Sequence, residues 1–176
     1  LLETFPKHFD AAETRFTLVD ALKKLEKNRE AIEELDLLLS SQKVEGKEDP
    51  QQWLYWQQRA GNTIANQFYR EGDYVSALHI YEVLAAVNST PEWQMPVWYQ
   101  IGVVYENLKQ PQKAAEIYEK VAKRLSEIKE PNESLKAVAE MAAWRKKTIN
   151  WESGARETNK ELSSSSGPRK ELVTTN

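Results

Sequence analysis

Cysteine is absent from this chain of 176 residues, and histidine and methionine occur only twice each. Without cysteine the chain has no disulfides, no thiolate metal ligands and no cysteine nucleophile. His8 and His79 lie far apart, and neither has a histidine or carboxylate companion at metal-binding spacing. No glycine-rich phosphate loop and no nucleophile motif is present. The sequence therefore predicts a non-catalytic protein without a metal or another cofactor.

Concentrated positive charge and long apolar runs are also missing. The 24 Lys and Arg residues are dispersed among 27 Asp and Glu residues, whereas a nucleic-acid-binding domain usually carries a basic stripe. The longest apolar runs are far shorter than the roughly 20 residues that cross a bilayer. What remains is 40% apolar and 29% charged, which is typical of one helix-rich globular domain. We expect no nucleic-acid partner and no membrane-spanning segment.

Two segments of the chain share one skeleton at a constant offset of 37 residues. Small residues that let two helices cross closely alternate with aromatic residues that fill the remaining space. Self-similarity at such a period indicates a helical repeat protein. Ile64, Ala65, Phe68, Ala77 and Tyr81 return as Ile101, Gly102, Tyr105, Ala114 and Tyr118.

The segment from Trp98 to Tyr118 resembles the tetratricopeptide repeat. Its spacing is W-x2-I-G-x2-Y followed by A-x3-Y, and the family has Leu and Phe at two of these positions and a period of about 34 residues. The resemblance implies an all-α, right-handed α-solenoid of about three helix pairs and a closing helix. It also implies a packing role for Trp98 and for the ten shared positions. Because one pair cannot bury its apolar face alone, neighbouring pairs must stack.

The same spacings extend in both directions more weakly. We expect a repeat domain over residues 1–160, with repeats at about 13–48, 58–94 and 95–131, a closing helix at about 132–160, and a flexible polar tail over 161–176. The first repeat rests on Leu18, Val19, Leu22, Ala31 and Leu35, and the closing helix on Leu135, Val138, Ala139 and Ala142.

Capping and helix-breaking residues predict several boundaries. Asp49 and Pro50 open a helix through about Arg70, and Gly72 closes it. Pro96 lies too deep for a regular helix starting at Pro91, so we place the regular start near Met95.

The six tryptophans divide into packing and contact candidates. We expect core or inter-repeat packing for Trp53, Trp56 and Trp98, a place on the packing face of the closing helix for Trp144 and Trp151, and an exposed contact for Trp93. Trp151, which lies near a segment end, is also a candidate for an exposed contact.

In the tetratricopeptide family the inner helices line a concave groove that holds a peptide or a partner helix. By this resemblance the groove residues are Arg59, Asn62, Asn66, Tyr69, Tyr99, Lys136 and Glu140. We predict contacts to a bound backbone at Asn62, Asn66 and Tyr99, since asparagine can both donate and accept. The set is similar in part to a carboxylate clamp, but Val103 and Glu106 stand where a clamp needs polar or basic groups.

The sequence therefore predicts a scaffold that binds another protein or a peptide. Two alternatives stay open: a docking or regulatory segment of a larger enzyme, and a self-assembly module that pairs through the N-terminal face. The chain begins at Leu1 without Met, and Pro6 stands where an earlier unit would end, so we expect a longer array. Residues 5–13 and 29–32 resemble repeats of bacterial cell-envelope tetratricopeptide proteins. That resemblance favours the periplasm, and the cytoplasm stays open.

Overall fold

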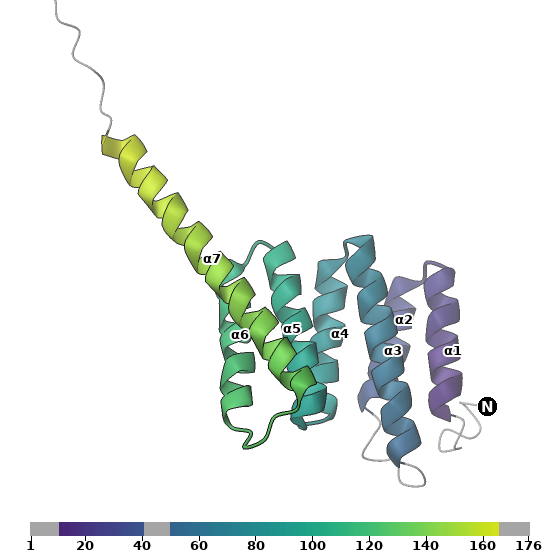
Figure 1. Cartoon of the computed structure of the whole chain (residues 1–176). Coiled ribbons are helices and arrows are strands. Elements are labelled where there is room, and N and C mark those ends of the chain that lie inside the picture. Colours follow the sequence, from purple (N-terminus) through teal and green to yellow (C-terminus); the bar gives the residue numbers. More distant parts are fainter. Residues whose placement is uncertain (1–10, 41–49, 166–176) are drawn as a thin grey trace, which may run out of the picture.

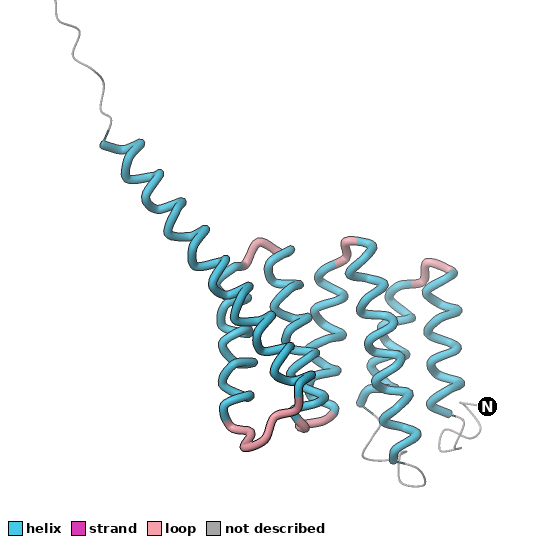
Figure 2. Tube along the Cα trace, viewed as in Figure 1, coloured by secondary structure: helices cyan, strands magenta, loops and turns pink. Residues whose placement is uncertain are grey.

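The computed structural model describes residues 11–40 and 50–165, and these ranges are α-helical with short turns and no strand (Figures 1 and 2). The expected all-α helical repeat solenoid is confirmed. Residues 1–10 with His8, residues 41–49 with Asp49, and the end of the expected tail lie outside the described residues. The helices are α1 (Ala11–Lys24), α2 (Asn28–Ser40), α3 (Pro50–Glu71), α4 (Tyr74–Val87), α5 (Pro91–Asn107), α6 (Pro111–Ser126) and α7 (Glu133–Ser165).

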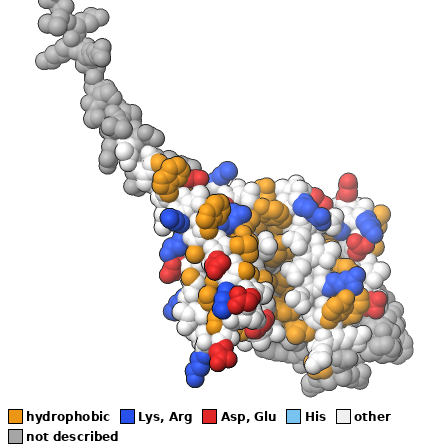
Figure 3. Space-filling model, viewed as in Figure 1, with side chains coloured by type: hydrophobic (Ala, Val, Ile, Leu, Met, Phe, Trp, Pro, Cys, Tyr) orange, Lys and Arg blue, Asp and Glu red, His pale blue; other side chains and the backbone are white. Residues whose placement is uncertain are grey.

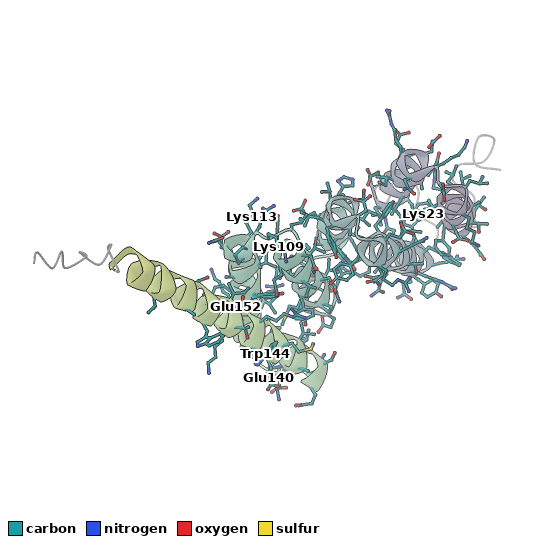
Figure 4. All side chains as sticks on the ribbon, turned by 90° about the horizontal axis from the view of Figure 1, so that it is seen from above. Lys23, Lys109, Lys113, Glu140, Trp144 and Glu152 are labelled. Atoms are coloured by element: carbon teal, nitrogen blue, oxygen red, sulfur yellow. The ribbon has the colours of Figure 1, made fainter. Side chains whose placement is uncertain are left out.

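The helices form three pairs and a closing helix. Within each pair α1 packs on α2, α3 on α4 and α5 on α6, and α7 then covers both α5 and α6. Along the array α1 meets α3, α2 meets α4 and α5 meets α7. The odd-numbered helices therefore form one layer, and α2, α4 and α6 form the other (Figure 4).

The shared skeleton lies in the core between the layers. The packing residues expected from the repeat pattern are buried, except that Tyr105 is only half-buried. Glycine is needed at the closest crossing, because a Cβ atom at Gly102 would lie 2.3 Å from Cε1 of the buried Tyr118 ring. At Gly61 the nearest atom would be Cδ1 of Leu84, at 2.8 Å. The helix axes in both pairs approach closely because these positions lack a side chain.

Local chemistry explains most of the helix ends. Gly72 adopts φ +82°, a left-handed conformation that favours glycine after a helix. The Asp73 carboxylate accepts a hydrogen bond from the Ser76 amide at 3.1 Å and caps α4. Asn132 does the same for α7, where its Oδ1 accepts from the Leu135 amide at 2.9 Å. These ends lie within a few residues of the positions expected from the sequence.

The expected start of the third inner helix near Met95 is wrong, because α5 is helical from Pro91. Pro96 removes only one amide donor, and the first turn is held from outside the helix. Trp93 is buried, and its indole nitrogen donates to the Leu84 carbonyl at 2.7 Å. Met95 is fully buried beside it. Tertiary packing thus outweighs the local cost of a proline inside a helix.

The expected positions of Trp93 and Trp144 are also wrong, and for Trp151 the exposed position expected near a segment end holds instead of the packed one. Trp93 is buried rather than an exposed contact, whereas Trp144 and Trp151 are 67% and 73% exposed rather than packed on the array. The inner face of α7 is made of smaller residues, and the two tryptophans lie on its opposite side. Those inner residues are Leu135, Ala139, Ala142 and Ile149. In addition, α7 runs to Ser165, beyond the end expected at about 160.

Candidate functional site: the layer of inner helices

The expected groove residues lie on three inner helices. Tyr99 is on α5, Lys136 and Glu140 are on α7, and the other four are on α3. Each is at least partly exposed. Figure 3 shows this layer from the front, with apolar side chains gathered in the hollow between α7 and α3. The layer therefore offers an apolar strip with polar groups along its helices.

Asn66 is held from behind by a buried tyrosine. The Tyr81 hydroxyl donates to Asn66 Oδ1 at 2.7 Å. Tyr81 is almost fully buried, and burial raises its pKa to about 12, so the hydroxyl stays protonated as a donor. With Oδ1 occupied, the Asn66 side-chain NH2 group is left to donate to other groups. Asn62 lies one turn earlier, half-buried, and no hydrogen bond engages its side chain within the described part of the chain.

Tyr69 connects α3 to α5. The Asn107 side-chain amide donates to the Tyr69 hydroxyl at 3.0 Å and to the Val103 carbonyl at 2.9 Å. This bridge ties together the C-terminal ends of the two inner helices. Nothing in the local sequence pattern separates Asn107 from a solvated residue at a helix end, so the sequence alone gives no sign of this bridge.

Tyr99 belongs to a polar network that joins α5, α6 and α7. Nε of Arg145 donates to the Tyr99 hydroxyl at 3.0 Å, and Nη1 donates to the two Glu106 carboxylate oxygens at 3.1 and 3.2 Å. The Tyr118 hydroxyl also donates to Glu106. The Tyr99 hydroxyl is therefore already used within the protein.

The same network sets the protonation states of its members. Burial raises the pKa of Tyr118, and the bond to the Glu106 carboxylate raises it further. Burial alone would lower the pKa of Arg145, but its bond to Tyr99 and the Glu106 charge outweigh burial and raise it. Arg145 thus remains a cation that Glu106 neutralises. In the sequence Arg145 stands in a basic run with Lys146 and Lys147, a pattern that favours a solvated helix face and gives no sign of this pairing.

Arg59 lies at the junction of α3 and α1. Its guanidinium carbon is 5.2 Å from the Trp56 ring centroid and 5.8 Å from that of Phe16 on α1. Its Nη1 donates to the Tyr55 hydroxyl at 2.8 Å. The side chain is nevertheless exposed, so its charge can meet an anionic group from outside.

On α7, Lys136 pairs with Glu133 of its own helix at 2.7 Å. Glu140 lines an open hollow of about 390 Å³ whose other lining residues are Tyr99, Met141, Trp144 and Arg145. The structure therefore divides the expected groove residues into a set on α3 and a set around Tyr99 and α7. The bridge from Asn107 to Tyr69 links α3 to α5.

A second hollow, of about 430 Å³, lies between α5 and α6 rather than on the layer of inner helices. Nζ of Lys120 is 4.0 Å from the Trp98 ring centroid there. Arg124 pairs with Glu127 at 3.0 Å and donates to the Ser89 carbonyl at 3.1 Å. The basic groups of this hollow are thus partly used to hold the loop between α4 and α5.

Other site chemistry is limited in the described ranges. They hold no group of three or more His, Asp or Glu side chains arranged to bind a metal ion. His79 pairs with Asp36 at 2.9 Å on the surface. No helix in these ranges combines the length and the apolar character that crossing a membrane requires.

The family model for the tetratricopeptide repeat matches residues 96–124, which cover most of the pair α5 and α6. The chain carries a tetratricopeptide repeat. Searches of curated proteins and of solved structures returned no match. Tetratricopeptide repeats generally mediate protein–protein interactions and are typically non-catalytic. The expected likeness to cell-envelope proteins, and with it the compartment, stays a prediction.

Proposed function

We propose that this tetratricopeptide-repeat protein is a scaffold that holds an extended segment of another protein across α3 and α5. The proposal rests mainly on the hydrogen bond that the Tyr81 hydroxyl donates to Asn66. It presents the Asn66 side-chain NH2 group in one orientation on an exposed helix face. A group fixed in this way loses less conformational entropy when it binds a carbonyl of the partner backbone.

Asn62 and Arg59 extend this polar row along α3. Asn62 stands one turn from Asn66, and its side chain can both donate to and accept from a peptide unit. Arg59 stands a further turn towards the helix start, where its exposed guanidinium can meet a carboxylate. The three side chains therefore match a backbone that runs along the helix and carries an acidic residue near Arg59.

The network around Arg145 favours an internal segment over a free C-terminus. A carboxylate clamp needs uncompensated cations, whereas Arg145 is already bound to Glu106 at 3.1 Å. Inserting a terminal carboxylate beside Glu106 would place like charges together, which is unfavourable in a partly buried site. The bound segment is thus expected to offer backbone and apolar groups at α5 rather than a carboxylate.

The experiment selects peptides from a displayed random library against the full chain and measures the affinity of a selected peptide by calorimetry. Asn62→Leu should weaken binding by about 2 kcal/mol, or about 30-fold. Its side chain makes no hydrogen bond in the described structure, so helicity and thermal midpoint should hardly change. Gln112→Leu on α6 is the matched control and should leave affinity unchanged, because Gln112 is exposed on the other layer.

Asn66 and Tyr99 are poorer probes than the sequence suggested. Changing Asn66 to Ala would leave the buried Tyr81 hydroxyl without its acceptor, and changing Tyr99 to Ala would remove a partner of Arg145. Either change would alter stability together with binding. Hydrogen exchange with the selected peptide should protect α3 and α5. Protection of α2, α4 or α6 instead, or an unchanged affinity of Asn62→Leu, would contradict the proposal, as would a library that yields no binder.

A further inference from the structure

The closing helix α7 has a second apolar face besides the one that packs on the array. Its residues recur at intervals of four and three, which is the spacing of a coiled-coil seam. We call this set the α7 stripe: Ala137, Met141, Trp144, Thr148, Trp151 and Ala155. The inner face of α7 uses the positions between them, so the two faces are distinct.

The α7 stripe is the most exposed apolar surface on a single helix in the described structure. Met141 is 45% exposed, and Trp144 and Trp151 are exposed by more than two thirds. Other large exposed apolar residues, such as Leu25 and Val75, stand singly on different elements. Tryptophan is costly to leave in water and is enriched at the centres of protein interfaces. This surface is therefore suited to contact with another chain.

The length of α7 leads to the same conclusion. The helix has 33 residues, and its C-terminal half projects beyond α5 and α6 (Figure 1). Ile149 is the last residue of its inner face that is buried among the described side chains. A helical segment of about 15 residues without tertiary packing is marginal in water. A partner along the α7 stripe would cover the start of the projecting half, where Trp151 lies.

We infer that the partner is a second copy of this chain, whose α7 packs antiparallel on the α7 stripe around a two-fold axis. The charges beside the stripe identify a second copy as the partner. Glu140 and Lys147 are exposed, flank the stripe on one side, and form no ion pair within the described ranges. Their neighbours Arg145 and Lys146, in contrast, pair with Glu106 and Glu119.

A two-fold axis between positions 143 and 144 matches each unpaired charge with its opposite. In an antiparallel pair, the numbers of two residues that face each other always have the same sum. Glu140 of each copy therefore faces Lys147 of the other copy. In the same register the two Trp144 side chains lie next to the axis, and Met141 of each copy lies within one helical turn of Trp144 of the other. Sulfur–aromatic contacts of this kind are favourable. One register thus satisfies the apolar stripe and both charges, as an isologous interface requires. Figure 4 shows Glu140 and Trp144 on α7, away from the rest of the array.

The two exposed tryptophans supply a large share of the area that a dimer buries. With an aromatic side chain burying up to about 250 Å², the exposed parts of Trp144 and Trp151 alone contribute about 350 Å² per copy. A standard interface buries roughly 800 Å² per partner. The two α7 helices overlap over positions 133–154 in this register, and the residues that flank the stripe there add to the contact.

The first test is sedimentation equilibrium of the full chain over a range of concentrations. We expect a reversible dimer, and Trp144→Glu should raise its dissociation constant by about 30-fold or more. Val75→Glu is the matched control, because it places the same charge at an exposed apolar position on α4. Its dimerisation should equal that of the wild type. Circular dichroism checks that both variants remain folded.

The second test uses charge reversal to identify the register. Glu140→Lys has two cations beside the stripe and Lys147→Glu has two anions, so each variant alone should dimerise at least about fivefold more weakly. Mixed in equal amounts, they should form a heterodimer with wild-type affinity, because every cross pair is then opposite in charge. A monomer at all concentrations up to about 1 mM would overturn the inference. The inference would also be overturned if Trp144→Glu left the dissociation constant of the dimer unchanged. The same holds if the mixture of charge variants dimerised no more tightly than either variant alone.

Discussion

The two repeats α3–α4 and α5–α6 have the same skeleton but use it differently. Tyr81 and Tyr118 stand 37 residues apart, and both are fully buried. Tyr81 donates to Asn66 within its own pair of helices. Tyr118 donates to Glu106, which also binds Arg145 from α7. The first tyrosine therefore orients a surface amide, whereas the second couples its repeat to the closing helix.

The position beside the crossing differs as well. The first repeat has Ala65 where the second has Gly102, and Ala65 is fully buried. In the second repeat the Tyr118 ring, tethered to Glu106, occupies the space that a Cβ atom would need. The second repeat therefore has room only for glycine at this position, whereas the first repeat accommodates alanine.

The largest expected effect is at this crossing. Gly102→Leu should lower the free energy of unfolding by about 1 to 3 kcal/mol, because the buried Tyr118 ring cannot move away without losing Glu106. The measurement is chemical denaturation followed by circular dichroism. Gly61→Ala is the control: the added Cβ meets the flexible end of Leu84, and better helix propensity offsets part of the cost. Equal denaturation midpoints for Gly102→Leu and the wild type would show that the crossing is not tightly packed.

A smaller loss of stability is expected when the polar network around Arg145 is broken, and a still smaller one when the Tyr81–Asn66 hydrogen bond is broken. Arg145→Met should cost about 1 to 2 kcal/mol, since Glu106 and the Tyr99 hydroxyl both lose a partner in a partly buried site. Asn66→Ala should cost about 1 kcal/mol, because only the Tyr81 hydroxyl loses its acceptor. Thermal unfolding of the two variants tests this order. If Asn66→Ala proves the more damaging change, the coupling of α5 and α6 to α7 is weaker than the contacts indicate.

A further effect on stability is absent at neutral pH and appears only at alkaline pH. The pKa of Tyr81 is raised from 10.0 to about 12 in the folded protein. Between these values the unfolded chain releases a proton that the folded chain keeps, so stability should be full below pH 10 and fall as pH rises towards 12. Denaturation midpoints against pH measure this slope, which Tyr81→Phe should reduce.

The change in tyrosine absorbance with pH compares Tyr81 and Tyr118 directly. The pKa of Tyr118 is raised by burial and by the Glu106 carboxylate, whereas no carboxylate accepts from Tyr81. Tyr81 should therefore ionise at a lower pH than Tyr118. Difference titrations of Tyr81→Phe and Tyr118→Phe would show the order, and earlier ionisation of Tyr118 would contradict the part assigned to Glu106.

The repeat period and the small and aromatic positions could be read from the sequence because they are local and recur. Helix ends set by Gly72, Asp73 and Asn132 could be predicted for the same reason, since each cap acts within one turn of its helix. The groove positions on α3, α5 and α7 follow from the same register. Their role in binding remains a prediction.

The sequence by itself therefore determined the all-α repeat, its skeleton and most of its boundaries, since these depend on periodicity and on neighbours within a few residues. Only the tertiary structure decided that Pro96 sits inside a helix, because the buried Trp93 holds the first turn of α5 from α4. It also decided that Arg145 joins Glu106, 39 residues away in the chain, and that Trp144 faces outward. Such outcomes depend on which distant side chains meet, and no local pattern of residues contains that information.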